Sequence, residues 1–346
     1  MGGGFRFESN EIVDNEALIL VSRERPSVCL VLPCFNEEEV LPETARRLLV
    51  LIRNLKDQQS ICDDSMICFV DDGSLDNTWS IIKGLSAVYS EVVGIKLSAN
   101  RGHQNALFCG LMHCQGDLVI SLDVDLQDDI NIIPEMITKY KAGNEIVYGV
   151  RGSRQSDSYF KRTTAEIYYH ALKALGVRVV FNHADYRLLS RTALESLREF
   201  KEDHLFLRGM IPLLGFKADT VIFERAKRFA GDSKYPLRKM LALAWQGVTS
   251  FSAFPLRLIT SAGIFVSFVS IALSVWALSV KLFTDNTVPG WASSVIPMYF
   301  LGGIQLLGLG VMGEYVAKIY EASKNRPRYI IEEVAGQKDA AHKDAL

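Results

Sequence analysis

Residues 119–130 read VISLDVDLQDDI, an apolar run that leads directly into aspartates at positions 123, 125, 128 and 129. Carboxylates repel one another and are costly to bury, so this cluster is unfavourable unless a counter-charge neutralises it. Two earlier runs have the same design: VCLVLPCF (28–35) is followed by Asn-Glu, and MICFVDD (66–72) ends in two aspartates. Because helical patterns follow these runs, the chain predicts an α/β domain with a mostly parallel sheet.

The acidic ends of these strands predict a site. In parallel sheets, ligands bind beyond the carboxyl ends of the strands, and here three of those ends carry acids. The oxygens of Asp123 and Asp125 suit a hard divalent cation, Mg²⁺ or Mn²⁺, that also holds a diphosphate. An Asp-x-Asp pair alone is equally typical of a solvated turn. The two further acidic strand ends favour the metal site.

Composition narrows the class of protein. The 346 residues have a net charge of −2, which does not indicate a nucleic-acid partner. The six cysteines form no CxxC pair, so we expect reduced, mostly buried thiols of a cytosolic compartment. Residues 1–26 have neither the pattern of a signal peptide nor that of a myristoylation site, and are interpreted as an N-terminal extension.

The C-terminal third differs in kind from the rest of the chain. Residues 258–280 carry no charge, and residues 295–316 carry one acid, Glu314. Both runs are long enough to cross a bilayer, which predicts transmembrane helices over 258–283 and 295–319, joined by an extracytoplasmic loop over 284–294. Cations flank the pair on the outer sides, which places the domain of residues 27–235 and the tail of 320–346 in the cytoplasm. Residues 236–257 are typical of an interfacial amphipathic helix. For the two apolar runs the alternative is a pair of buried core helices, and for the amphipathic segment it is a helix of the soluble domain.

Four motifs occur in a fixed order: VLPCFNEEE, VDDGSLDNT, NRGHQNAL and LDVDLQDD. This set resembles the family-two glycosyltransferases, which have the Rossmann-like GT-A nucleotide-sugar fold. The later ADYRLLSR and RFAGDSKYPL, with the two apolar runs, resemble the polyprenyl-phosphate glycosyltransferases. These include the dolichol-phosphate mannose synthases and, more similar still, the bacterial undecaprenyl-phosphate (bactoprenol) glucosyltransferases. The resemblance covers about residues 27–331.

The resemblance implies roles for individual residues. Donor-binding roles fall on residues of the first four motifs: Pro33, Asn36, Glu37, Asp71, Asp72, Gln104 and Asp123. Gln127 resembles a third metal ligand beside Asp123 and Asp125. Contacts with the acceptor phosphate fall on the later polar residues Arg162, Arg187, Ser190, Arg228 and Lys234.

Two catalytic roles remain open for Asp185, which either acts as a general base or orients Arg187. A phosphate monoester is largely ionised at neutral pH, which weakens the need for a base. The resemblance also implies that residues 101–105 shape the floor of the donor site. His103, like the histidines at 170, 183 and 204, lacks the spacing of a metal site or triad, so no role as a metal ligand or catalytic base is expected for it.

The resemblance therefore implies a reaction. A hexose, most of all glucose, is transferred with inversion from a UDP-sugar to undecaprenyl phosphate at the cytoplasmic face of the inner membrane, for O-antigen or cell-envelope modification. A homo-oligomer is expected, with a tetramer as one arrangement. Alternatives are another sugar (aminoarabinose, an N-acetylhexosamine, or mannose from GDP-mannose), a processive polysaccharide synthase and a silent membrane scaffold. The chain lacks the Gln-x-x-Arg-Trp motif of processive synthases.

Overall fold

The computed structural model describes residues 23–152, 183–200, 205–224 and 291–336, and scattered positions between 256 and 279. Contacts within the chain divide these residues into two compact units. One comprises the described residues up to 224 together with 327–336, and the other comprises the remaining described residues from 256 to 326. Each unit is described by itself.

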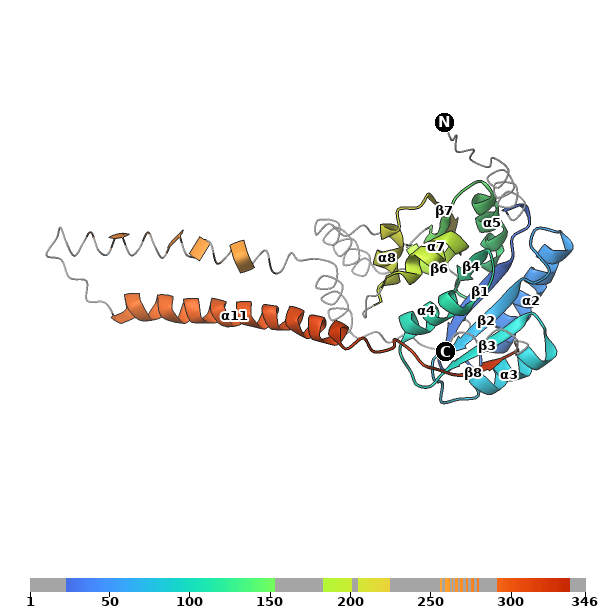
Figure 1. Cartoon of the computed structure of the whole chain (residues 1–346), viewed down its shortest axis with the longest axis horizontal. Helices are drawn as coiled ribbons and strands as arrows, with labels where there is room; N and C mark the ends of the chain where they lie inside the picture. Colours follow the sequence, from blue (N-terminus) through green and yellow to red (C-terminus); the bar gives the residue numbers. More distant parts are fainter. Residues whose placement is uncertain are drawn as a thin grey trace, which may run out of the picture. The chain divides into compact units, whose positions relative to one another are not determined.

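The first unit is built on a mixed sheet (Figure 1), in which eight strands fall within the described residues, in the order β7-β5-β6-β4-β1-β2-β3-β8. At its centre β1 pairs in parallel with both β2 and β4, and β2 pairs in parallel with β3, as predicted. β6 runs antiparallel to β4 and β5, while β7 is parallel to β5. The bounds of the strands are β1 (Val28–Cys34), β2 (Met66–Asp71), β3 (Val92–Leu97), β4 (Leu118–Ser121), β5 (Ile146–Arg151), β6 (His183–Ser190), β7 (Ala218–Phe223) and β8 (Ile331–Ala335).

Helices pack on the sheet through apolar stripes. In α2 (Leu41–Asp57) the buried positions recur every three or four residues, from Leu41 through Leu48 and Ile52 to Leu55, which turns one face of the helix towards the sheet. The remaining helices of this unit among the described residues are α3 (Thr78–Val88), α4 (His103–His113), the short 3₁₀ helix η1 (Ile130–Ile132), α5 (Ile133–Lys141), α7 (Arg191–Arg198) and α8 (Leu207–Leu213).

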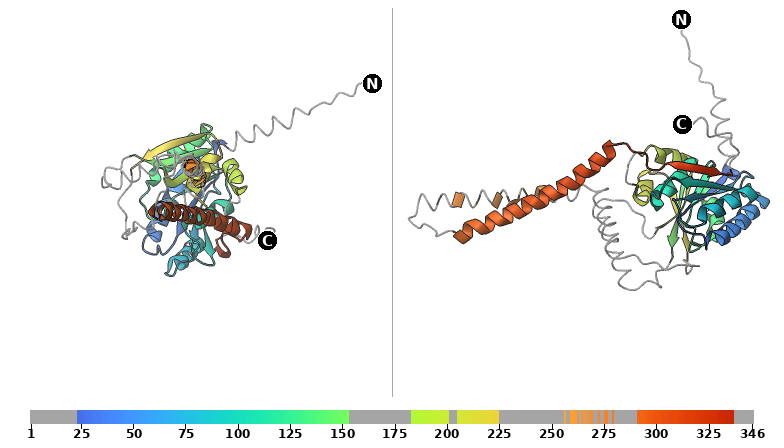
Figure 2. Two further views of the ribbon diagram at one scale, coloured as in Figure 1. Left: turned by 90° about the vertical axis from the view of Figure 1, so that its left-hand side faces the viewer. Right: turned by 90° about the horizontal axis from the view of Figure 1, so that it is seen from below.

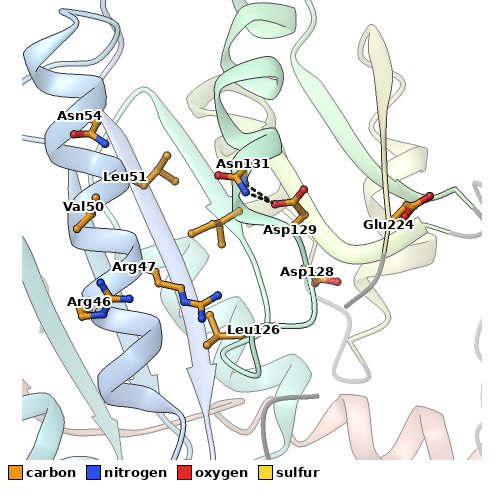
Figure 3. A pocket seen from close by; sticks show the side chains of 11 residues that line it. Arg46, Arg47, Val50, Leu51, Asn54, Leu126, Asp128, Asp129, Asn131 and Glu224 are labelled. Carbon is orange, nitrogen blue, oxygen red and sulfur yellow. Dashed lines mark hydrogen bonds between the residues drawn. The ribbon is translucent and has the colours of Figure 1, made fainter. Parts of the chain in front are cut away.

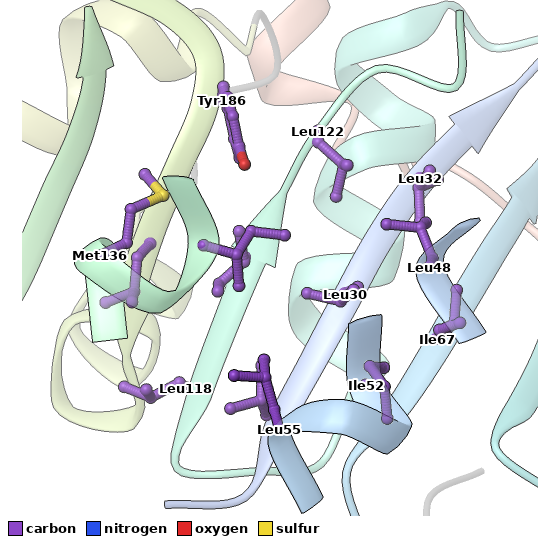
Figure 4. Packing of buried hydrophobic residues seen from close by; sticks show 14 of the residues in the cluster. Leu30, Leu32, Leu48, Ile52, Leu55, Ile67, Leu118, Leu122, Met136 and Tyr186 are labelled. Atoms are coloured by element: carbon purple, nitrogen blue, oxygen red, sulfur yellow. The ribbon is translucent and has the colours of Figure 1, made fainter. Parts of the chain in front are cut away.

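The core lies between β1, α2 and α5 (Figure 4). Leu30 and Leu32 of β1 pack with Ile52 of α2 and Met136 of α5, and all four side chains are buried. Burying one such side chain contributes about 1.5–3 kcal/mol. This packing holds β1 against α2 and α5, and so positions the loop that follows the carboxyl end of β1.

A strand after the last helix completes the sheet. β8 pairs antiparallel with β3, and Glu333 accepts hydrogen bonds from Trp79 Nε1 (3.0 Å) and Lys83 Nζ (2.7 Å) of α3. Just before it, Arg328 Nη2 donates to the Phe200 carbonyl at 2.8 Å. The sequence places these residues in a tail and does not predict the strand. The segment after α11 is therefore an integral part of the first unit.

The second unit contains the long helix α11 (Trp291–Ser323), visible in Figures 1 and 2. It carries exposed apolar side chains along its length, among them Met298, Leu306 and Ile319. Within the described part of the chain, no helix meets the combined length and hydropathy expected of a membrane span. The two predicted spans are therefore not confirmed: 295–319 lies within α11, whereas much of 258–283 falls outside the described residues, as do 1–22, 236–255 and 284–290.

Candidate active site

The loops after β1 and β2 are joined by hydrogen bonds. Asn36 adopts a left-handed backbone conformation (φ 55°), which asparagine tolerates better than most residues. Its side-chain oxygen accepts from Leu75 N at 2.8 Å, and its backbone N–H donates to Ser74 Oγ at 3.0 Å. Asn36 and Glu37, both predicted to bind the donor, line a pocket of about 440 Å³. Pro33 is buried inside β1, opposite Val70.

The two aspartates after β2 have different environments. Asp72 is fully engaged, because its two oxygens accept from the backbone N–H groups of Arg101 (2.7 Å) and Gly102 (2.9 Å). Asp71 is completely buried, and burial raises the pKa of its carboxyl group. Asp71 Oδ1 accepts from Ser74 N at 3.3 Å, while Oδ2 has no partner among the described residues. The two aspartates therefore differ: Asp72 holds the next loop, whereas Asp71 keeps one buried carboxylate oxygen without a hydrogen-bond partner among the described residues.

Gly73 allows the loop after β3 to pack closely against the loop after β2. Gly73 has φ 67°, and a Cβ atom there would lie 2.6 Å from the backbone nitrogen of Asn100. Any side chain would push apart the loops that follow β2 and β3. Glycine therefore allows the loop held by Asp72 to lie directly beside the end of β2.

The Asp-x-Asp loop follows β4. Thr44 of α2 donates its hydroxyl to the Val124 carbonyl at 2.7 Å, and Gln127 N donates to Asp125 Oδ1 at 3.1 Å. Gln127 is buried, and its side-chain oxygen has no hydrogen-bond partner in the described part of the chain. Burial raises the pKa of Asp123, with Asp185 and Asp125 adding to the effect.

These three residues fit a hard cation. The carboxylates of Asp123 and Asp125 and the orphaned amide oxygen of Gln127 are the oxygen donors that Mg²⁺ and Mn²⁺ prefer. No group of three or more His, Cys, Asp or Glu side chains with metal-binding geometry occurs among the described residues. A cation at this site would thus draw part of its coordination from the ligand diphosphate or from water.

β6 brings a second charged group to the same edge. Its antiparallel pairing sets Arg187 opposite Ser121, so Asp185 lies just beyond the end of β4, near Asp123. Asp185 accepts hydrogen bonds from Arg187 Nη2 and, at 3.1 Å each, from Arg208 Nε and Nη2. Burial alone would raise the pKa of Asp185, but the charges of Arg208 and Arg187 and the hydrogen bonds from Arg208 hold it well below its usual range.

Two residues of this group are missed by the sequence. His103 Nε2 lies 3.7 Å from both Asp123 Oδ1 and Asp185 Oδ2, between the two carboxylates. Arg208 lies at the start of α8, whose Leu207 N donates to Gln104 Oε1 at 3.3 Å. Gln104, predicted to bind the donor, therefore connects α4 to α8. The motif NRGHQNAL contains His103, but the surrounding sequence LFLRGM gives no indication that Arg208 belongs to the site.

The structure differs from the prediction at Ser190. This residue pairs with Leu118 at the start of β4, the end of the strand opposite Asp123, and its Oγ accepts from Ala193 N at 3.1 Å. Ser190 is the N-cap of α7 and does not reach the acceptor phosphate from that edge. Arg162, Arg228 and Lys234, the other predicted acceptor contacts beside Arg187, lie outside the described residues.

Another hollow lies beside α2. A pocket of about 650 Å³ between α2 and residues 126–131 is lined by Arg46, Arg47 and Asp129 among others (Figure 3). It contains none of the predicted site residues, although Leu126 on its wall follows Asp125 directly. The chemistry described above lies at the carboxyl edge of the sheet, where polar groups from several elements converge, so we place the site there rather than in this hollow.

The fold and the charged edge of the sheet define a class: an α/β protein with an acidic site at the carboxyl ends of its parallel strands. Residues 29–198 match the profile of glycosyl transferase family 2. The chain is 46% identical to the uncharacterized glycosyltransferase YkoT of Bacillus subtilis, over 90% of this chain and 93% of that protein. It is 40% identical to a bactoprenol glucosyl transferase of Shigella phage SfV, over 88% and 97% of the two chains. It is equally similar to the prophage bactoprenol glucosyl transferase homolog of Escherichia coli, at 40% over 89% and 99%.

The chain belongs to glycosyl transferase family 2. It is a glycosyltransferase with a GT-A fold, as the resemblance implies.

Proposed function

We propose that this enzyme transfers glucose from UDP-glucose to a polyprenyl phosphate, undecaprenyl phosphate in the first place. The observation that carries the proposal is the extent of the similarity to the bactoprenol glucosyl transferases. It spans 306 residues, far more than the 29–198 of the family profile, so it includes much of the C-terminal third. The C-terminal third contains the long apolar runs, which suit an enzyme whose acceptor is a lipid.

The site supports a direct displacement. An oxygen of the acceptor phosphate attacks the anomeric carbon, the bond from that carbon to the UDP oxygen breaks, and the configuration inverts. Asp123, Asp125 and Gln127 would hold Mg²⁺ or Mn²⁺, which supplies positive charge to the leaving diphosphate. Asp71 Oδ2, which has no partner among the described residues, would accept a hydrogen bond from the nucleotide, and Asn36 and Glu37 line a pocket at the end of β1. The enzyme contributes positioning and charge rather than a covalent intermediate.

Asp185 is better suited to orienting arginines than to taking a proton. Its low pKa makes it a weak base, and both of its oxygens already accept hydrogen bonds from guanidinium groups. The acceptor phosphate is ionised at neutral pH and brings its own nucleophilic oxygen. This supports the second of the two roles that the sequence leaves open.

We place the enzyme in the inner membrane, with its catalytic unit on the cytoplasmic side and with spans over 258–283 and 295–319. Support comes from the uncharged run of 258–280 and from the exposed apolar side chains of α11. We also propose a homo-oligomer. Gly302, Gly310 and Gly313 of α11 have open space where a Cβ would lie, which suits close contact between helices.

The test is a donor panel. Membranes containing the full chain are incubated with undecaprenyl phosphate and UDP-glucose, UDP-N-acetylglucosamine, a UDP-aminoarabinose donor or GDP-mannose, and the extracted lipid is identified by mass spectrometry. The proposal predicts a hexosyl lipid from UDP-glucose. A product from another donor alone would change the sugar, and UDP release without any lipid product would overturn the proposal.

A further inference from the structure

Asp185 is the centre of a three-residue group. Arg208 approaches its carboxylate with two hydrogen bonds of 3.1 Å, one to each oxygen, and Arg187 adds a third hydrogen bond. The two-point contact fixes the plane of the Arg208 guanidinium, because both the carboxylate and the guanidinium are planar. Because this contact occupies the Nε–Nη2 edge, it holds the other edge of the guanidinium, which carries Nη1, in a defined orientation for a further anion.

The two arginines differ in access to ligand. The side chain of Arg187 is 1% exposed, whereas that of Arg208 is 35% exposed. Arg187 therefore acts as a buried counter-charge for Asp185. Within this group only Arg208 presents a substantial cationic surface to the outside.

Arg208 also lies close to the metal-binding edge. His103 bridges the two parts of the site, with its Nε2 3.7 Å from Asp123 on one side and 3.7 Å from Asp185 on the other. The hydrogen bond from Leu207 N to Gln104 Oε1 ties the start of α8 to the same turn of α4. A phosphate bound beside Asp123 would therefore be separated from the Arg208 guanidinium only by His103 and Asp185.

Carboxylates are concentrated at this edge before any substrate is present. Asp123 and Asp185 lie within 3.7 Å of the same His103 nitrogen, Asp125 follows two residues after Asp123, and Arg187 is committed to Asp185. A phosphorylated substrate brings further negative charge, which requires a cationic group that can face it. The exposed part of Arg208 is the group in this cluster that meets the requirement.

We propose that Arg208 binds a phosphate group of a substrate, with Asp185 orienting its guanidinium and Arg187 compensating Asp185 from the buried side. The inference rests on the proposed function, and it adds a residue that neither the sequence motifs nor the similarity to relatives assigns. The phosphate belongs either to the lipid acceptor or to the donor diphosphate. Its chemistry is the same in both cases, an ionised phosphate oxygen facing a planar donor.

The experiment compares Arg208→Gln and Arg208→Lys with a matched control, Arg198→Gln, in the full chain. Arg198 is a half-exposed arginine at the end of α7, where its Nη2 donates to the Met112 carbonyl at 2.9 Å. For each variant we measure KM and kcat for the lipid phosphate at saturating UDP-glucose, the dissociation constant of UDP by calorimetry, and the thermal unfolding temperature.

We expect Arg208→Gln to raise either the KM for the lipid phosphate or the dissociation constant of UDP about tenfold to a hundredfold, which is the effect of losing a hydrogen bond to a charged group. A rise in KM for the lipid phosphate assigns Arg208 to the acceptor, and a rise in the UDP dissociation constant assigns it to the donor. Arg208→Lys keeps the charge but loses the fork, so an intermediate value is expected.

The inference is overturned if both constants stay within twofold of those of Arg198→Gln, whatever happens to kcat. If Arg208→Gln does not fold, the same two constants are read from Arg208→Lys. Should the wild-type enzyme bind UDP but form no glycosylated lipid, the proposed function fails, and the Arg208 inference is then judged on UDP affinity alone.

Discussion

Replacing Asp185 by asparagine is expected to destabilise the catalytic unit by about 3–5 kcal/mol, the range found when one partner of a buried ion pair is removed. The estimate rests on burial: the side chain of Asp185 is 11% exposed and that of Arg187 is 1% exposed, so Arg187 would keep its charge without a buried partner. Arg208 contributes little to this cost, because its more exposed guanidinium remains hydrated. For a unit of this size the change corresponds to a drop of about 6–20 °C in the unfolding temperature.

The assay is thermal unfolding of the full chain, followed by circular dichroism. A double variant, Asp185→Leu with Arg187→Met, removes both buried charges and is expected to recover most of the lost stability while remaining inactive. The reasoning is refuted if Asp185→Asn unfolds within about 2 °C of the wild type, since Arg187 would then not depend on Asp185.

Acid titration gives an independent check on Asp185. Its pKa is lowered in the folded state, so its contribution to stability is complete above the ordinary carboxyl pKa, which is about 4, and is lost as the pH falls towards the folded value. Wild type and Asp185→Asn should therefore differ in unfolding temperature at pH 7, and the difference should shrink progressively as the pH falls below about 4. A constant difference across that range would contradict the assigned pKa shift.

Three further outcomes are expected. Gly110→Ala should lower the free energy of unfolding by about 1–3 kcal/mol, because the new Cβ would lie 2.3 Å from Val31 Cγ1. Gly84→Ala, whose Cβ would meet nothing within 4 Å, should leave that free energy unchanged or raise it, and urea unfolding measures both variants. Asp71→Asn should weaken UDP binding about tenfold in calorimetry and yet not lower the unfolding temperature, since burial of this carboxylate raises its pKa and costs stability at pH 7. Chelation by EDTA should abolish glucosyl transfer to the lipid, and added Mn²⁺ or Mg²⁺ should restore it, as measured by the amount of glycosylated lipid formed from radiolabelled UDP-glucose. Transfer that persists after chelation would exclude the assigned cation.

The sequence predicts the central sheet well because the information is local. Each apolar strand ends in its own polar residues, so Asp71 and Asp123 can be placed at one edge from the alternation of strands and helices alone. Parallel pairing of β1, β2, β3 and β4 confirms that edge. Both Asp71 and Asp72 are buried, and they differ in hydrogen bonding: Asp72 accepts from two backbone N–H groups of the next loop, whereas Asp71 Oδ2 has no partner among the described residues. This difference is not visible in the sequence, because it depends on the loop that Gly73 admits.

What the sequence misses depends on pairing between distant segments. Arg208 reaches Asp185 because β6 reverses direction beside β4 and α8 begins next to Gln104, and neither relation has a local signal. The sequence groups Ser190 with Arg187 because the two share one short motif, but along a strand they are about 10 Å apart, and Ser190 lies towards the opposite edge of the sheet. β8 is missed for a related reason, since a five-residue strand is recognised only by the β3 edge that it covers.

The most direct test of the central claim is the stoichiometry of transfer in the presence of Mn²⁺. UDP released and hexosyl lipid formed are measured in the same reaction, for the wild-type chain and for Asp123→Asn combined with Asp125→Asn. We predict one UDP for each lipid-linked hexose in the wild type and neither product in the variant. Lipid product formed by the variant at a rate near that of the wild type would contradict the placement of the active site at this edge of the sheet.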